Sequence, residues 1–357
     1  MPPSPSAAES SERMPGTAEV FVGPGLGEPV TVLPRLNPAV FGFMAGGLAA
    51  CGAVTFTNPM EVVKTRLQLQ GENLIPSGST RTGAPRLRLG TLSTLTFLFR
   101  SEGLAGLQKG LGTAYLYQLC LNGTRLGLYT PTKDFFTRHL AEATAAGEVP
   151  RNRTAVNILS GMVAGIAGAC VGSPLYLIKT RMQSYSTAAG VGHQHHYTGT
   201  WGALRRILRQ DGVRGLFRGM DASMVRTGVG SAVQLSAYDK CKDTLLGLNG
   251  GDSWFQDNIY THSVASLLTG LLVCFVMNPF DVVSTRMYNQ KTDPVTGRGS
   301  LYRNPAHCLV TTFRSEGISA FYKALVPQYV RLGPHTVLMF VFMEQIKALG
   351  QKWDLVG

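Results

Sequence analysis

Residues 59–66 read PMEVVKTR, residues 174–181 read PLYLIKTR and residues 279–286 read PFDVVSTR. Counted from 59 to 174 and from 174 to 279, the copies lie 115 and 105 residues apart. A second pattern of acid-glycine and then base-glycine or base-alanine follows each copy: EG at 102 with KG at 109, DG at 211 with RG at 218, and EG at 316 with KA at 323. Two patterns that recur together at a near-constant period indicate three tandem copies of one structural unit.

Long apolar stretches surround these patterns. Residues 36–60 and 154–178 contain no Asp, Glu, Lys or Arg, and residues 259–280 contain only His262 as a basic group. As a helix, each stretch is long enough to cross a bilayer core of about 30 Å. Three further apolar stretches are each interrupted by one arginine: Arg125 in 111–132, Arg226 in 222–238 and Arg331 in 324–343.

We therefore predict an all-α membrane protein with six transmembrane helices in three pairs, at 37–66, 111–140, 153–182, 220–246, 258–287 and 324–349. A short amphipathic helix is expected inside each pair, at 89–100, 199–210 and 305–315. Small residues spaced for close helix packing, as in 161–172, favour this reading over a large soluble helical protein.

The repeats also predict the domain organisation. Three repeat units occupy 36–140, 141–247 and 248–357. Residues 1–35 are rich in Pro, Ser, Gly and Ala, and we expect them to form a disordered extension. They match neither a secretory signal nor an Arg-rich transit peptide, so targeting information is expected within the helices.

Charge indicates orientation. The chain has 33 basic and 21 acidic residues, a formal net charge of +12. Each long connector carries five Lys or Arg residues, whereas the two short connectors are balanced or acidic. The positive-inside rule places the long connectors on the negative side of the membrane, and an even helix count puts both termini on the other side. The bases lie in three membrane-facing loops without a recognition motif, which favours anionic lipid over nucleic acid as a partner.

The threefold pattern of proline, acid and base, followed by acid-glycine and base-glycine, resembles the mitochondrial carrier family over about residues 36–350. The resemblance implies a threefold pseudo-symmetric bundle around one central substrate cavity in the mitochondrial inner membrane. It places the long connectors in the matrix and both termini toward the intermembrane space. It also implies a functional monomer without a cofactor, and cardiolipin bound where Gly110 and Gly219 begin helices.

The proline pattern predicts a gate at the matrix side. Pro59, Pro174 and Pro279 each remove one backbone hydrogen bond, and we expect them to kink the first, third and fifth long helices toward a common axis. The acid two residues after each proline and the base five residues after it share a helix face. Three such helices can link acid to base around a ring.

Two positions depart from this pattern, because Tyr176 replaces an acid and Ser284 replaces a base. If each acid pairs with the base of the next such helix, the ring contains three links: Glu61 with Lys179, Tyr176 with Ser284, and Asp281 with Lys64. The reverse order would leave charges facing uncharged partners, at a cost of several kcal/mol. We therefore predict two ion pairs and one hydrogen bond.

The resemblance adds Gln68 and Gln183 as residues that brace the ion pairs, with Tyr288 in the third place. The alternative is that these charges only cap helix ends.

The resemblance also implies a second network, on the cytoplasmic side, formed by an aromatic-acid-x-x-base pattern. Tyr238 and Asp239 with Lys242 match it fully, whereas Lys133 has lost its acid and Glu344 with Lys347 lacks the aromatic residue. We expect a weakened cytoplasmic gate and a resting state open to the cytoplasm.

Substrate chemistry is expected from the interrupting arginines, because a charge at mid-membrane is expensive and by default functional. Arg226 and Arg331 each lie eight residues after the base of the second pattern, and Tyr117 holds that place in the second long helix. These positions, with Thr227, match the family's substrate contact points, and Arg125 lies further along the helix of Tyr117. Guanidinium groups bind carboxylate or sulfate bidentately. The contact residues resemble the oxoacid and dicarboxylate branch that includes fungal oxaloacetate carriers, which implies oxaloacetate, malonate, sulfate or related dianions.

Several alternatives remain at this point. Arg226 and Arg331 could form internal salt bridges, and His335 could be a proton partner or a hydrogen-bonded structural residue. A proton-leak carrier of the uncoupling type would share the fold, as would a membrane scaffold that does not transport. No nucleophile elbow, phosphate loop or metal-ligand spacing points to an enzyme, and we expect His193, His195 and His196 to lie in a solvated loop without a metal.

Overall fold

The computed structural model describes residues 38–72, 90–143, 150–186, 191–247, 259–293 and 299–353, and these are mostly helical. This part of the chain contains six long helices: α1 (Pro38–Leu69), α3 (Leu111–Ala143), α4 (Pro150–Ser184), α6 (Met220–Gly247), α7 (Ile259–Asn289) and α9 (Leu325–Lys352). Between them lie α2 (Thr91–Leu107), α5 (Thr200–Leu216), α8 (Pro305–Glu316) and the 3-10 turn η2 (Ile318–Tyr322). All nine predicted helices are therefore present. The predicted extension at 1–35 lies outside the described residues.

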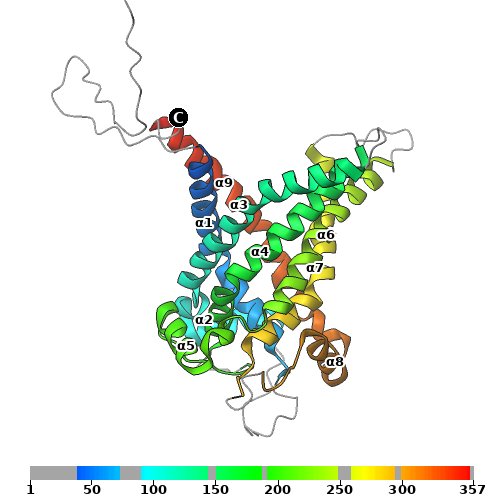
Figure 1. Ribbon diagram of the computed structural model, residues 1–357. Helices are drawn as coiled ribbons and strands as arrows, with labels where there is room; N and C mark the ends of the chain where they lie inside the picture. Colours follow the sequence, from blue (N-terminus) through cyan, green and yellow to red (C-terminus); the bar gives the residue numbers. More distant parts are fainter. Residues whose placement is uncertain are drawn as a thin grey trace, which may run out of the picture.

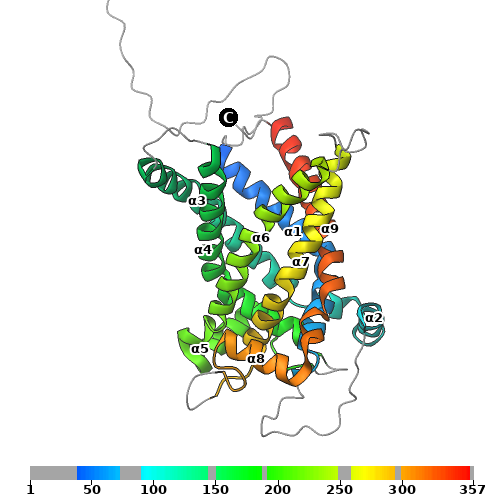
Figure 2. The same cartoon turned by 90° about the vertical axis from the view of Figure 1, so that its right-hand side faces the viewer.

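Each repeat contributes a long helix containing the proline, a short helix, and a second long helix. The short helices α2, α5 and α8 lie together at one end of the molecule, called here the short-helix end (Figures 1 and 2). Helix α1 begins and α9 ends at the opposite end (Figure 1). Pro59, Pro174 and Pro279 each lie inside a continuous helix.

The glycines of the second pattern occupy positions that require glycine. Gly103, Gly212 and Gly317 have φ angles of 64°, 67° and 76°, a left-handed conformation that is costly for other residues. Gly110 and Gly219 have φ angles of 74° and 81° directly before α3 and α6. The repeated glycines thus shape the turn out of each short helix and, in two repeats, the start of the next long helix. Helices α2 and α5 end seven and six residues beyond the predicted ends at 100 and 210, because each continues after its bend at a glycine.

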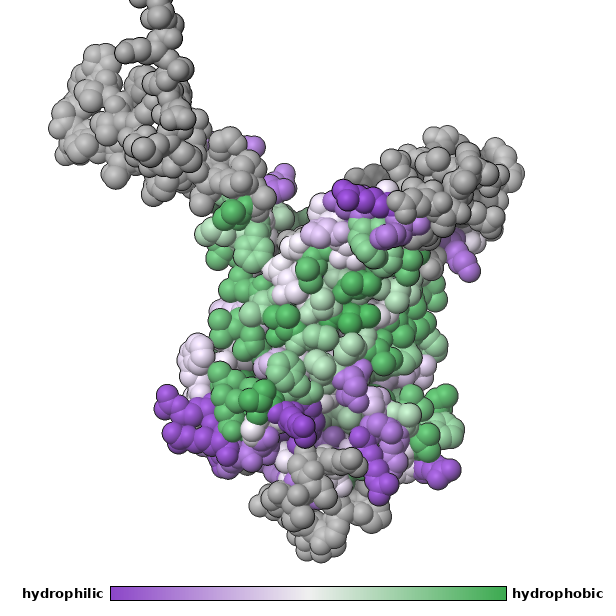
Figure 3. Space-filling model, in the orientation of Figure 1, coloured by the Kyte–Doolittle hydropathy of each residue, from purple (hydrophilic) through white to green (hydrophobic). Residues whose placement is uncertain are grey.

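The outer surface of the bundle is apolar. A band of hydrophobic residues covers the middle of the molecule, and hydrophilic residues gather at the short-helix end (Figure 3). Large side chains such as Phe56, Leu267 and Phe340 are at least 60% exposed, which is the arrangement of a surface in contact with lipid rather than water. Three helices meet a criterion of length and apolarity for spanning a membrane, over Val40–Leu69, Val156–Ser184 and Val264–Asn289. The other three long helices were predicted to span as well, and their interrupting polar residues keep them below that criterion.

Three arginines connect the repeats at the short-helix end, and we call them the arginine layer: Arg66, Arg181 and Arg286. Each ends one copy of the repeated proline pattern and is almost fully buried. The Nε of each arginine donates to a backbone carbonyl of a neighbouring repeat at 3.1 Å: Arg66 to Gln183, Arg181 to Tyr288 and Arg286 to Gln68. Each acceptor lies nine residues after the proline of its own repeat. The layer therefore has the threefold symmetry that the sequence repeat predicts.

The acid of each acid-glycine pattern partners this layer unequally. Glu102 binds Arg66 at 2.7 Å and Lys109 at 2.5 Å. Glu316 binds Arg286 and Lys323, both at 2.6 Å. The second repeat has the shorter Asp211, whose carboxylate accepts from Thr292. Arg181 instead donates to the Tyr197 hydroxyl, and its Nη2 is buried without a hydrogen-bond partner. The second repeat is thus the least ionic of the three here.

Glu72 lies just after α1 at this end and is 3% exposed. Burial is the main cause that raises the pKa of its carboxyl from 4.5 to about 7, and the nearby charge of Arg286 opposes that rise only in part. Tyr302 and Glu316 are the other titratable neighbours. Because the folded protein holds this proton more tightly than the unfolded chain, stability is greatest at low pH and falls as the pH rises toward 7.

We expect the thermal stability of the detergent-solubilised protein to fall between about pH 5 and about pH 7, with Glu72 contributing roughly 2 kcal/mol of that loss. Glu72→Gln keeps the shape and removes the titration, so its stability should depend less on pH over this interval. The measurement is thermal unfolding of both proteins across the interval. A pH dependence as steep in Glu72→Gln as in the wild type would contradict the assignment.

Candidate functional site

Two buried ion pairs join the proline-containing helices above the arginine layer. Lys179 on α4 lies 2.6 Å from Glu61 on α1, and Lys64 on α1 lies 3.0 Å from Asp281 on α7. This is the pairing order inferred from the sequence. Because separating a buried pair leaves an uncompensated charge, these bonds hold α1, α4 and α7 together at the short-helix end.

The predicted hydrogen bond between Tyr176 and Ser284 is absent. The Ser284 hydroxyl is buried without a partner. The Tyr176 ring packs between Tyr117 and Tyr288, with ring centroids 5.3 Å and 5.0 Å away. A phenol ring is larger than the acid it replaces and gains more by packing against aromatic rings than a single hydroxyl bond provides. An aromatic cluster therefore stands where the hydrogen bond was predicted.

The glutamines brace the helices rather than the ion pairs. Gln68 accepts from the Thr285 hydroxyl at 2.7 Å, and Gln183 accepts from the Thr65 hydroxyl at 3.2 Å. Each bond joins two proline-containing helices. In the third place, the Tyr288 hydroxyl is bonded to Ser173 at 3.0 Å. The sequence located these residues but assigned them the wrong partners, since their amides reach the neighbouring threonine before any charged group.

Arg226 on α6 is joined to the same group. Its Nη1 lies 3.0 Å from Asp281, and its guanidinium carbon lies 5.6 Å from the centroid of the Tyr176 ring. Asp281 also accepts from Gln328 on α9 at 2.8 Å. The internal salt bridge, considered as the alternative role of Arg226, is therefore present. Sequence reasoning missed Gln328, although its place one helical turn before Arg331 was an available signal.

Arg331 differs from Arg226. It forms no ion pair with any carboxylate among the described residues, and its Nε is buried without a hydrogen-bond partner. The ring of Tyr117 is buried, with Lys179 Nζ 5.5 Å from its centroid. Thr227 is half-buried, and its hydroxyl donates to its own helix at Ser223.

Two other predicted residues lie apart from this group. Arg125 is exposed on α3. His335 lies 3.3 Å from the Thr57 hydroxyl, which is the hydrogen-bonded structural role considered for it.

The central group carries excess positive charge. Its four cations are Lys64, Lys179, Arg226 and Arg331, and its two carboxylates are those of Glu61 and Asp281. Both lysines lie within electrostatic reach of both arginines. The sum, four minus two, is an excess of +2 in a group to which all six long helices contribute when Tyr117 is included. Such a site is complementary to a doubly charged anion.

A family model described as mitochondrial carrier protein matches this chain over residues 37–140, 150–249 and 255–352. The chain belongs to the mitochondrial carrier family. The mitochondrial oxaloacetate transport protein of Saccharomyces cerevisiae is 45% identical over 307 residues, covering 86% of this chain and 89% of that protein. Its namesake in Schizosaccharomyces pombe is 43% identical, covering 91% and 95%. The mitochondrial citrate transporter E of Aspergillus niger is 41% identical, covering 87% and 94%. The chain is thus a multi-pass protein of the mitochondrial inner membrane and a transporter rather than an enzyme.

A second network of ion pairs was expected at the end of the carrier opposite the short helices. The members of this network that the structure describes form no ion pairs with other described residues. Lys133 on α3 is exposed, as are Glu344 and Lys347 on α9, and none of the three forms an ion pair among the described residues. The side chains of Asp239 and Lys242 lie outside the described residues. The carrier is therefore tied by ion pairs at the short-helix end and not by these residues at the other.

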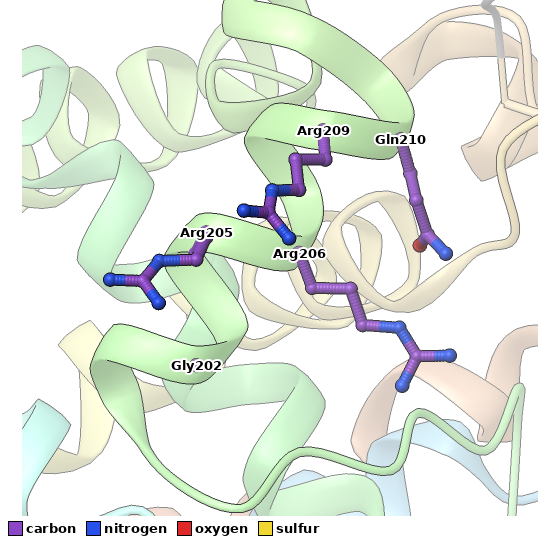
Figure 4. Close-up of a pocket in the computed structure, with 5 residues that line it drawn as sticks. All are labelled: Gly202, Arg205, Arg206, Arg209 and Gln210. Carbon is purple, nitrogen blue, oxygen red and sulfur yellow. The ribbon is translucent and has the colours of Figure 1, made fainter.

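A basic pocket of about 240 Å³ lies on α5, outside the central group. Arg205 and Arg209 extend to one side of the helix and Arg206 to the other (Figure 4), and Gly202 and Gln210 complete the lining. Arg206 donates to the backbone carbonyl of His196 at 3.1 Å. Because the pocket shares no residue with the central group, it is not part of the candidate substrate site.

Ser284→Ala should leave stability unchanged or slightly raised, because it removes a buried hydroxyl without a hydrogen-bond partner. Thr285→Val is the matched control, since it removes a neighbouring hydroxyl that does donate, to Gln68, and should destabilise by about 1 kcal/mol. Thermal unfolding in detergent compares the two. An equal loss in both variants would mean that Ser284 has a partner after all.

Proposed function

We propose that this carrier moves small dianions across the mitochondrial inner membrane: oxaloacetate, malonate, sulfate or related dicarboxylates and oxoacids. The observation that carries the proposal is the excess of +2 in the central group, with Arg331 lacking any described carboxylate. A guanidinium group binds carboxylate or sulfate through two parallel hydrogen bonds. The names of the relatives, which are oxaloacetate and citrate transporters, support an organic-anion substrate.

The proposed mechanism is alternating access. The bonds Glu61–Lys179 and Asp281–Lys64 form the matrix gate, with the aromatic cluster around Tyr176 completing it. Lys133, Asp239, Lys242, Glu344 and Lys347 are proposed to form the opposite gate. The three of them whose side chains the structure describes, Lys133, Glu344 and Lys347, are exposed and form no ion pair within the described part of the chain. The gates close in turn around the bound dianion, so that the substrate passes without a continuous channel.

Orientation follows from charge. Each long connector carries five basic residues, which places the short-helix end in the matrix and both termini toward the intermembrane space. One chain supplies all three repeats and every residue of the central group, so the functional unit is proposed to be a monomer. The six long helices are proposed to span the membrane as a threefold bundle.

Cardiolipin is the proposed lipid partner. Gly110 and Gly219 lie directly before α3 and α6, where free backbone N–H groups favour a phosphate, and each follows a basic residue. We expect cardiolipin to raise the melting temperature of the detergent-solubilised carrier above that in phosphatidylcholine. Equal melting temperatures in thermal-shift assays with the two lipids would contradict this partner.

Arg331→Gln should reduce the initial rate of malonate and sulfate uptake into proteoliposomes roughly a hundredfold, because it removes a charged bidentate partner of the substrate. Arg331→Lys retains the charge without the fork and should retain part of the activity. Arg226→Gln should also abolish uptake, since the second anionic group then has no guanidinium partner.

Arg100→Gln on α2 is the matched control, because Arg100 is exposed and outside the central group. Its uptake rate should equal that of the wild type. If folded Arg331→Gln also transported at the wild-type rate, the substrate site would lie elsewhere.

A further inference from the structure

Asp281 belongs to two sets of interactions at once. Its Oδ2 accepts from Lys64 at 3.0 Å and from Gln328 at 2.8 Å, while its Oδ1 accepts from Arg226 at 3.0 Å. The acid is fully buried and connects α7 to α1, α6 and α9. Glu61, the other acid of the gate, has one ion-pair partner, Lys179. The carboxylate of Asp281 is thus ion-paired with the guanidinium of Arg226, which the proposed function assigns to the substrate.

The two arginines of the site are consequently in different states. Arg226 is already paired with Asp281, and the ring of Tyr176 lies beneath its guanidinium at 5.6 Å, a distance typical of a cation–π contact. Arg331 has no described carboxylate partner. Its acidic neighbour Glu61 is already ion-paired with Lys179. An incoming anion can therefore bind Arg331 without displacing an ion-pair partner, whereas it reaches Arg226 only in competition with Asp281.

The bond between Arg226 and Asp281 also joins two repeats at a weak place in the gate. Arg226 lies in the second repeat and Asp281 in the third. Between these repeats the gate ring has Tyr176 and Ser284 in place of an ion pair, and Ser284 has no hydrogen-bond partner. Releasing Arg226 from Asp281 would loosen the second repeat from the third where the ring itself provides no charge pair.

We propose that Asp281 is a stand-in for one anionic group of the substrate: a dianion binds Arg331 with one group and displaces Asp281 from Arg226 with the other. This inference rests on the proposed function. After the exchange Asp281 still has Lys64 and Gln328, so no buried acid is orphaned. Glu61, Asp281 and the two substrate charges then balance the four cations. A monoanion binds Arg331 alone and leaves the bond between Arg226 and Asp281 intact, so it occupies the site without loosening the gate.

If a substrate needs a second anionic group to displace Asp281 from Arg226, Asp281 restricts transport to doubly charged substrates. The test compares two ligands, malonate and its monomethyl ester, which is nearly the same size and carries one charge. The wild-type carrier should take up malonate, and the monoester should inhibit that uptake without being taken up. Uptake of the monoester at the malonate rate would overturn the inference, and absence of malonate and sulfate uptake would overturn the proposed function itself.

The matched variants are Asp281→Asn and Glu61→Gln. Each removes one negative charge from the central group, but only the first frees Arg226. Measured by ligand-dependent thermal shift, Asp281→Asn should bind malonate roughly tenfold more tightly than the wild type, and Glu61→Gln should gain less than about a third of that increase. An equal gain in both variants, or no gain in folded Asp281→Asn, would show that Asp281 does not compete with substrate.

Gln328→Leu provides a second test that leaves every charge in place. It removes the hydrogen bond that helps hold Asp281 away from Arg226, so displacement should become harder. The apparent affinity for malonate should fall about threefold, while inhibition by the monoester should be unchanged. An unchanged malonate affinity, or an equal loss for both ligands, would overturn the inference even if Asp281→Asn failed to fold.

Discussion

Asp281 must remain paired wherever it is buried, and this constraint governs the closed end of the carrier. The acid is fully buried on α7, and a buried carboxylate without a partner would cost several kcal/mol. Lys64, Arg226 and Gln328 meet that requirement from three other helices. The positions of α1, α6, α7 and α9 are thus coupled through one side chain, and a change in any of its partners would affect both the proposed gate and the proposed substrate site.

The carrier departs from threefold symmetry mainly in its second repeat. In the gate, Tyr176 takes the place of an acid and packs among aromatic rings. In the arginine layer, Asp211 takes the place of the longer glutamate, and Arg181 turns to a tyrosine hydroxyl instead of a carboxylate. Both changes replace ionic bonds by weaker contacts. The boundary between the second and third repeats is consequently held in part by Arg226, a residue that also serves the proposed substrate.

The sequence was sufficient for the helices and the ion pairs but not for the contacts between side chains. Helix positions follow from apolar length, proline and glycine, and the pairing of Glu61 with Lys179 follows from the cost of the alternative order. The position of Tyr176 does not, because a periodic pattern places a residue on a helix face without saying which neighbour its ring reaches. The sharing of Asp281 was also hidden, because it depends on how α6 and α9 are placed along α7. The repeated final arginine of the proline pattern was visible in the sequence, and its layer of backbone bonds could have been inferred from it.

The excess charge of the central group bears on whether the carrier exchanges substrates or leaks. Closing both proposed gates around an empty site would bury four cations with only two carboxylates, and that imbalance is costly in a membrane interior. Closing them around a dianion buries a balanced group, so the loaded carrier crosses the occluded state more easily than the empty one. In this conformation Lys133, Glu344 and Lys347 are exposed and form no ion pair among the described residues, so no contact seen here closes that end of the protein. The charge arrangement that suits the proposed dianion therefore also favours exchange of one such dianion for another over uncoupled leakage.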